Sequence, residues 1–216
     1  MIDLHSHILP DIDDGPDSWE ESLRLCRLML AQGIHTVVAT PHYWPGNYQP
    51  AAELIKDKVN KLRLLLKDNQ LSLEVLGGSE IHFCPEMIDL LDSKKLLTIN
   101  ASRYVLIELP SQLNKDILFQ AFFQLQLKGY IPIVAHPEKN RLIQECPEIM
   151  NELVLKGALG QVTAGSLLED ACPRDRQCAQ ELLRRNCVQV LSSDAHSYCF
   201  RPPCLRQGLE KAALLL

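Results

Sequence analysis

The first fifteen residues contain a dense group of side chains that could do chemistry. His5 and His7 lie in an alternating stretch, residues 2–8, which predicts a β-strand. Residues two apart on a strand point to the same face, so the two imidazoles should project together. Imidazole and carboxylate groups are common ligands of zinc, manganese and iron, so the stretch predicts a metal site. The carboxylates that follow are Asp11, Asp13 and Asp14.

Further candidate ligands follow separate β-rich segments. These segments are residues 36–40, 72–76, 104–107, 131–135, 158–163 and 188–191. The candidates at or just past the strand ends are His42, Glu80, Glu108, His136, Asp194 and His196. Because the carboxyl ends of the strands in an α/β barrel converge on one face, we expect these sequence-distant side chains to meet in space.

Apolar residues at helical spacing lie between these strands. The predicted helices run from Ser18 to Gly33 and over residues 51–68, 115–128, 147–156 and 175–185. Ser18 followed three residues later by Glu21 predicts a capping box at the first helix. Strands that alternate with helices, in roughly seven units, predict one parallel α/β domain over residues 1–216, either a closed barrel or a doubly wound sheet.

The composition bounds the function and the compartment. A net charge of −5 argues against non-specific nucleic-acid binding as the main activity, because that binding depends on Lys and Arg neutralising phosphates. The eight cysteines form no C-x-x-C pair, and the chain opens on a strand rather than an apolar signal segment. No apolar run approaches the roughly 20 residues needed to cross a bilayer. We therefore expect a reduced, cytoplasmic protein.

The candidate ligands outnumber what one metal ion can use. Five imidazoles and at least three carboxylates exceed a four-coordinate shell, so we expect two or three ions with a carboxylate bridging a pair. Such a centre suits hydrolysis of a phosphoester, in which cations clamp the phosphate oxygens while an activated water attacks. Aspartate and glutamate together with histidine favour manganese, iron or zinc over magnesium.

Several short motifs carry a family resemblance that spans essentially the whole chain. They are Asp3-Leu4-His5-Ser6-His7, Thr40-Pro41-His42, Gly78-Ser79-Glu80, His136-Pro137-Glu138 and Ser193-Asp194-Ala195-His196. This set resembles the PHP (polymerase and histidinol phosphatase) superfamily, which implies a distorted seven-stranded (β/α) barrel. The opening segment, with Asp13-Asp14-Gly15-Pro16, looks most like the bacterial metal-dependent protein-tyrosine phosphatases of capsule and exopolysaccharide loci. Those enzymes dephosphorylate the tyrosine-rich tail of a cognate bacterial tyrosine kinase, and homo-oligomers are possible.

The resemblance also implies roles for single residues. One metal would be held by His5, His7, Glu80 and Asp194, a second by Glu80, Glu108 and His136, and a third by Asp14, His42 and His196. Arg201 matches an arginine thought to grip the phosphate, and Asp194 and His196 would act beside it. Two positions depart from the family pattern. Lys139 stands where an arginine is usual, for which Arg141 could substitute, and Thr163 stands where asparagine is frequent.

Alternatives remain open at three points. Tyr43 and Trp44 either line a pocket for a phosphotyrosine ring or cover the barrel mouth. Cys178 and Arg184 match the spacing of thiol phosphatases, but the stretch is helical and lacks the glycine-rich loop that activates a thiolate, so we interpret Cys178 as structural. For the whole protein, a tyrosine phosphatase competes with a small-molecule phosphatase, such as one for histidinol phosphate, and with a non-catalytic binding module.

Overall fold

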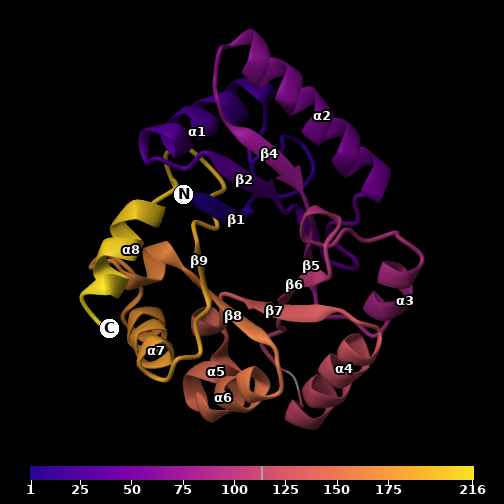
Figure 1. Cartoon of the computed structure of the whole chain (residues 1–216), viewed down its shortest axis with the longest axis vertical. Coiled ribbons are helices and arrows are strands. Elements are labelled where there is room, and N and C mark those ends of the chain that lie inside the picture. The colour runs from indigo at the N-terminus through magenta and orange to yellow at the C-terminus, as the bar shows by residue number, and fades with distance from the viewer. Residues whose placement is uncertain (113) are drawn as a thin grey trace.

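A computed structural model describes residues 1–112 and 114–216. Its strands surround one centre, and helices form a ring outside them (Figure 1). The strand segments are β1 (Ile2–Ser6), β2 (Thr36–Ala39), β3 (His42–Tyr43), β4 (Glu74–Gly77), β5 (Glu80–His82), β6 (Tyr104–Glu108), β7 (Ile131–Ala135), β8 (Leu159–Thr163) and β9 (Val190–Ser192). The α-helices are α1 (Trp19–Ala31), α2 (Ala52–Asp68), α3 (Met87–Asp92), α4 (Lys115–Leu127), α5 (Arg141–Glu145), α6 (Glu148–Leu155), α7 (Pro173–Arg184) and α8 (Leu205–Ala213).

All the paired strands are parallel. One sheet has the order β1-β2-β4, and the other has the order β3-β5-β6-β7-β8-β9. Both faces of such strands are covered, which explains the nearly continuous buried runs in β2 and β7. The strands therefore place their carboxyl ends on the same side of the molecule.

Two strands are interrupted halfway, and this separates the two sheets. Pro41 lies between β2 and β3 and has no N–H to donate to a ladder. Gly78 lies between β4 and β5 in a tight spot, where an added Cβ would come within 3.2 Å of Val38 and Ile99. Each interrupted pair follows the path of one strand, so the segments in the described residues occupy seven strand positions, as the sequence predicts.

The first and last strands lie side by side. The N–H of Asp194 donates to the carbonyl of His5 at 3.0 Å, and the N–H of His7 donates to the carbonyl of Ala195 at 2.8 Å. The buried carboxylate of Asp3 accepts from the N–H of Ser193 at 3.0 Å. Side chains from both ends of the chain consequently meet in the centre of the ring.

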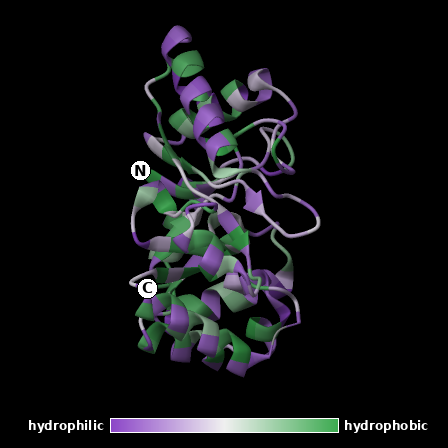
Figure 2. Ribbon diagram, turned by 90° about the vertical axis from the view of Figure 1, so that its right-hand side faces the viewer, coloured by the Kyte–Doolittle hydropathy of each residue, from purple (hydrophilic) through white to green (hydrophobic). Residues whose placement is uncertain are grey.

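The helices cover the outside of the strands with their apolar faces, and hydrophilic and hydrophobic residues alternate along them (Figure 2). Ser18 caps α1 by accepting from the N–H of Glu21 at 3.3 Å. The predicted capping box is only half correct, because the carboxylate of Glu21 accepts from the N–H of Asp17 rather than from that of Ser18. No helix in the described ranges combines the length and apolar character that a membrane span requires.

Element boundaries differ from the sequence prediction by one or two residues at several ends. β1 ends at Ser6 instead of continuing to residue 8, because the chain turns into the loop that carries Asp13 and Asp14. The predicted third and last strands each begin two residues later than expected, at Glu74 and Val190. Helices α3, α5 and α8 were not predicted.

Candidate metal and phosphate site

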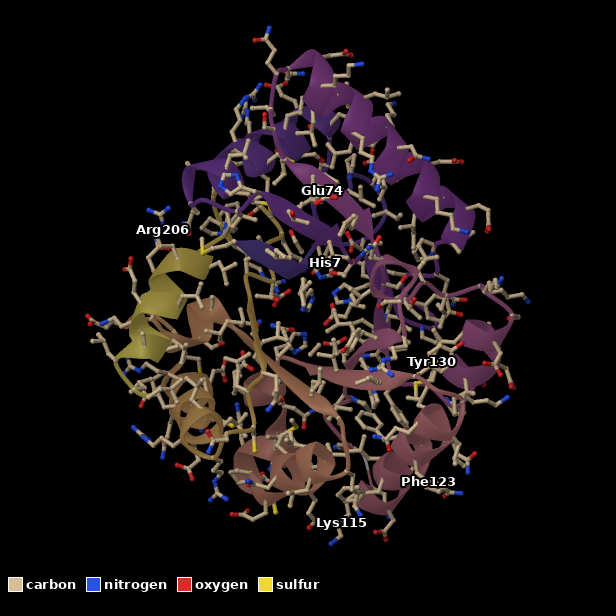
Figure 3. The ribbon with its side chains drawn as sticks, in the orientation of Figure 1. His7, Glu74, Lys115, Phe123, Tyr130 and Arg206 are labelled. Carbon is tan, nitrogen blue, oxygen red and sulfur yellow. The ribbon has the colours of Figure 1, made fainter. Side chains whose placement is uncertain are left out.

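The candidate ligands meet at the carboxyl ends of the strands, inside the ring, where His7 is labelled in Figure 3. The two imidazoles of β1 point the same way, with 3.2 Å between their Nε2 atoms. The carboxylate oxygen Oε2 of Glu80 lies 3.2 Å from each of these nitrogens. Oδ1 of Asp194 lies 3.4 Å from Nε2 of His5 and 3.6 Å from that of His7. These four residues are the set predicted for one ion.

Glu80 is the hub of the cluster and is fully buried. Besides the two histidines of β1, its Oε2 lies 3.0 Å from Nδ1 of His42, while its Oε1 lies 2.7 Å from Nε2 of His136. Within the described residues, neither Oε2 of Glu80 nor Nδ1 of His42 has a hydrogen-bond partner. Buried polar atoms without partners are rare, and a cation between them would satisfy both. The donor set therefore fits a bridging carboxylate.

A second group of ligands lies beside this hub. Oδ1 of Asp14 is 3.3 Å from Nε2 of His196 and 3.5 Å from Nε2 of His42. These three residues and His7 form one of three groups whose potential ligand atoms lie within 4.8 Å of one another. The predicted third ligand set is thus brought together, with His7 added to it.

The predicted second ligand set is assembled less tightly. His136 contacts Glu80, but its Nε2 is 3.9 Å from Oε1 of Glu108. Oε2 of Glu108 instead lies 3.0 Å from Nδ1 of His82, and Glu108 groups with His42 and Glu80 as possible ligands. His82 follows Glu80 closely in the sequence, but no role was predicted for it.

Two acceptors orient the imidazoles of β1 through the Nδ1 atoms, whereas the Nε2 atoms face the cluster. Nδ1 of His7 lies 2.6 Å from Oδ2 of Asp13, and Nδ1 of His5 lies 2.8 Å from Oε1 of Gln161. Both contacts favour a proton on Nδ1, which leaves Nε2 free to bind a metal. Asp13 also accepts from the N–H groups of Gly15 and His42, each at 3.0 Å. The acidic run marked the loop of Asp13, but nothing in the sequence distinguished Gln161 within β8.

The charges of the cluster shift the pKa values of its members strongly. Burial opposes protonation of His7, but the carboxylates of Asp13 and Glu80 outweigh it and raise the pKa to about 10. The same competition, with Glu80 as the main carboxylate, raises the pKa of His136 to about 9. Burial and the neighbouring His7 instead lower the pKa of His196 to about 4. A cation bound here must therefore displace protons from His7 and His136, but not from His196.

Asp194 faces two sides at once. Its Oδ1 points to the histidines of β1, whereas its Oδ2 accepts from Nζ of Lys139 at 2.7 Å and from a terminal nitrogen of Arg201 at 2.8 Å. Burial alone would raise the pKa of this carboxyl, but His5, Lys139 and other cations hold it well below the usual range. Asp194 and His136 both have left-handed backbones, with φ of 52° and 30°. Such backbones are uncommon outside glycine and concentrate at functional sites.

The structure places Lys139 and Arg201, but not Arg141, beside the cluster. The side chain of Arg141 is 77% exposed and pairs with Glu145 at 2.7 Å on α5. Arg141 lines an outer pocket with Gln144 and Arg174 instead. The expectation that Arg141 stands in for the missing arginine is therefore not supported by its position, because the start of α5 directs it outward.

The two predicted aromatic residues have different surroundings. Tyr43 packs against the apolar core, and burial next to Cys84 raises the pKa of its phenol. Trp44 stacks on His82 with 4.6 Å between the ring centroids. Tyr48, for which no role was predicted, stacks on His42 with 6.0 Å between the ring centroids. This arrangement favours a covering role for Trp44.

Cys178 is buried within helix α7 rather than placed in a loop of backbone amides. Burial and the neighbouring carboxylates of Glu138 and Asp175 raise the pKa of its thiol to about 12. The rejection of thiol-phosphatase chemistry agrees with this environment, because a nucleophilic cysteine needs a lowered pKa.

The fold and the clustered side chains define the class of this protein: an α/β barrel with groups that could hold metal ions at the carboxyl ends of its strands. Residues 1–213 match the model of the CpsB/CapC family of capsular polysaccharide synthesis, and the chain belongs to this family. This membership confirms the resemblance drawn from the motifs.

Relatives and solved structures agree with the family. The chain is 39% identical over 207 residues to a putative tyrosine-protein phosphatase CapC of Staphylococcus aureus, covering 96% of this chain and 81% of the relative. It is 39% identical over 197 residues to the tyrosine-protein phosphatase YwqE of Bacillus subtilis, covering 91% and 78%.

Two solved structures have a fold similar to that of this chain. A crystal structure from a study of YwqE and of CpsB from Streptococcus pneumoniae, described as metal-dependent tyrosine phosphatases, has a TM-score of 0.92 at 36% identity and covers 100% of this chain and 85% of the matched one. Histidinol phosphate phosphatase from Lactococcus lactis shares the fold, with a TM-score of 0.58 at 16% identity, over 99% of this chain and 90% of the other.

Proposed function

We propose that this chain is a metal-dependent phosphomonoesterase that removes phosphate from phosphotyrosine in a protein substrate. The observation that carries the proposal is the buried carboxylate of Glu80, which lies between four imidazoles and has an unpartnered oxygen. An arrangement of this kind is suited to holding adjacent cations. Family membership and the tyrosine-phosphatase names of the relatives support the choice of phosphotyrosine.

The residues around Glu80 have different proposed roles. Divalent cations supply, when bound, a water of lowered pKa and positive charge that offsets the phosphate oxygens. Arg201 and Lys139 hold the phosphate from the side of Asp194, and the guanidinium of Arg201 can bind two oxygens at once. Asp13 and Gln161 keep the imidazoles of β1 turned toward the cluster.

We assign the ligands to three overlapping groups. His5, His7, Glu80 and Asp194 hold one ion; Glu80, Glu108 and His136 hold a second, with His42 within reach; Asp14, His42 and His196 hold a third. Manganese is the proposed metal, because mixed carboxylate and imidazole donors suit it better than magnesium, although iron and zinc accept the same donors.

The proposed partner is the tyrosine-phosphorylated tail of a bacterial tyrosine kinase in capsule or exopolysaccharide synthesis. The proposed compartment is the cytoplasm, because the eight cysteines, all within the described ranges, are free. Residues 1–216 act as one catalytic domain, since strands from both ends of the chain supply ligands to the same cluster. Assembly into homo-oligomers stays a prediction.

The test compares a phosphotyrosine peptide with histidinol phosphate on one manganese-loaded sample, with an EDTA-treated control. We expect hydrolysis of the peptide to dominate and to disappear with chelation. Glu80→Gln should abolish metal binding and activity, while Glu74→Gln, on the exposed part of β4, should not. Preference for histidinol phosphate would discard the protein substrate, and metal binding without turnover of either compound would favour a binding module.

A further inference from the structure

A pocket of about 390 Å³ opens beside the phosphate-facing side of Asp194. Lys139, Asp194 and Arg201 line this pocket, together with the carboxylates of Asp170 and Asp175. Leu168, Phe200 and Pro202 also line it and give it apolar surface. A pocket that combines charged groups with apolar side chains suits a ligand that has both a charged and an apolar part. We call Lys139, Asp194, Arg201, Leu168, Phe200 and Pro202 together the ring pocket.

Phe200 is held next to Arg201 by a tight turn. The hydroxyl oxygen of Ser197 accepts from the N–H of Phe200 at 2.9 Å and from the N–H of Arg201 at 3.0 Å. The carbonyl of Arg201 in turn accepts from the N–H of His196 at 3.0 Å. These bonds fix the backbone of both residues next to His196, a candidate metal ligand. The ring of Phe200 is nevertheless 90% exposed, so it presents a free aromatic face at the pocket rim.

We propose that the ring pocket takes the aromatic ring of phosphotyrosine, with Phe200 as a specificity residue. This inference rests on the proposed function and deepens it. A phosphate held by Arg201 and Lys139 places the group attached to it at the mouth of the same pocket, because these two residues line it. A phenyl ring would bury apolar surface against Leu168, Phe200 and Pro202, whereas the shorter aliphatic side chain of phosphoserine would not reach that surface.

Trp44 and Tyr43 are weaker candidates for the same role. The ring of Trp44 already stacks on His82 with an interplanar angle of 14°. His82 in turn contacts Glu108, so Trp44 lies over the part of the cluster that contains Glu108. Tyr43 is partly buried and packs against the apolar core. The free aromatic surface next to the phosphate-holding groups is that of Phe200.

The experiment uses the full manganese-loaded chain and the variant Phe200→Ala. We expect KM for a phosphotyrosine peptide to rise on the order of tenfold with kcat little changed, since an aromatic contact and its buried area are lost. The inhibition constant of inorganic phosphate should stay at the wild-type value, because phosphate lacks the ring. Direct binding of a peptide with a non-hydrolysable phosphonate analogue of phosphotyrosine should weaken by the same factor, and Phe200→Tyr should restore it.

Phe123→Ala is the matched control, because Phe123 is an exposed phenylalanine on α4 at the outer edge of the molecule (Figure 3). Unchanged KM and peptide binding in Phe200→Ala would overturn the inference, as would a loss of peptide binding in Trp44→Ala alone. Weaker inhibition by inorganic phosphate in Phe200→Ala would also overturn the inference, because the substitution would then act through Arg201 rather than through the aromatic ring. Failure of the wild-type protein to hydrolyse the peptide would instead remove the proposed function, and the ring pocket with it.

Discussion

The variant Asp13→Asn tests how much the orientation of His7, a proposed metal ligand, contributes to metal affinity, because Asp13 contacts His7 but is not itself a proposed ligand. Oδ2 of Asp13 faces Nδ1 of His7 at 2.6 Å and accepts from the N–H of His42, while Oδ1 accepts from the N–H of Gly15. An asparagine must put its NH2 group at one of these positions, so in either orientation a donor meets a backbone donor. An unsatisfied buried group costs about 1–3 kcal/mol. The charged acceptor of His7 is lost as well.

We therefore expect the affinity for manganese to fall about 10- to 100-fold, the range typical for residues that orient metal ligands. Competition with a chelating dye at fixed pH measures the affinity, and far-UV circular dichroism checks that the barrel is folded. Asp17→Asn is the control, because Asp17 is an exposed carboxylate in the same loop. Wild-type affinity in Asp13→Asn would refute the orienting role, and so would an equal loss in Asp17→Asn.

Three further predictions address the thiol of Cys178, the proton release that accompanies metal binding, and the side chains of Lys139 and Arg141. Cys178→Ser should keep nearly full activity in a phosphotyrosine peptide assay and lower the unfolding free energy by about 1–3 kcal/mol, because it buries a more polar group; a dead variant with normal metal content would contradict the mechanism. Since the pKa values of His7 and His136 are about 10 and 9, both imidazoles are protonated at pH 7, so metal binding should release protons and tighten as pH rises toward 9. Calorimetry in buffers of different ionisation enthalpy measures that release, and pH-independent affinity would refute it. Lys139→Ala should weaken inhibition by inorganic phosphate at least about tenfold, as expected for loss of a charge-assisted hydrogen bond, whereas Arg141→Ala should leave it unchanged, and the reverse result would restore Arg141 to the site.

The clustering of the candidate ligands could be predicted from the sequence because their residue types are scarce and their positions repeat. Histidine and acidic residues at the ends of β-rich segments are visible without a structure, and parallel strands bring such ends to one face. The role of Gln161 was not predictable, because a glutamine in a strand gives no sign of facing an imidazole. The short strands β3 and β5 that follow the breaks at Pro41 and Gly78 were not predicted either, since they depend on how neighbouring strands pair.

Arg141 shows where spacing alone misleads. Lys139 and Arg141 lie two residues apart, and in an extended segment both would face the same side. The chain instead forms a short 3-10 turn and begins α5 at Arg141, with Asn140 capping the helix by accepting from the N–H of Leu142. The helix start turns Arg141 toward Glu145 and solvent. A local cap, not the chemistry of the side chain, decides which cation reaches Asp194.

Asp194 lies between the candidate metal ligands and the two cations proposed to bind phosphate, so a substitution of Asp194 affects both groups. One oxygen faces the histidines of β1 and the other faces Lys139 and Arg201, so any change of the side chain perturbs both sides together. Its left-handed backbone and its hydrogen bond to His5 also tie it to β1. Loss of activity in Asp194→Asn would therefore not distinguish metal loss from loss of phosphate binding. Asp13 contacts the cluster from behind and Phe200 lines the ring pocket, so variants of these two residues separate the effects that Asp194 combines.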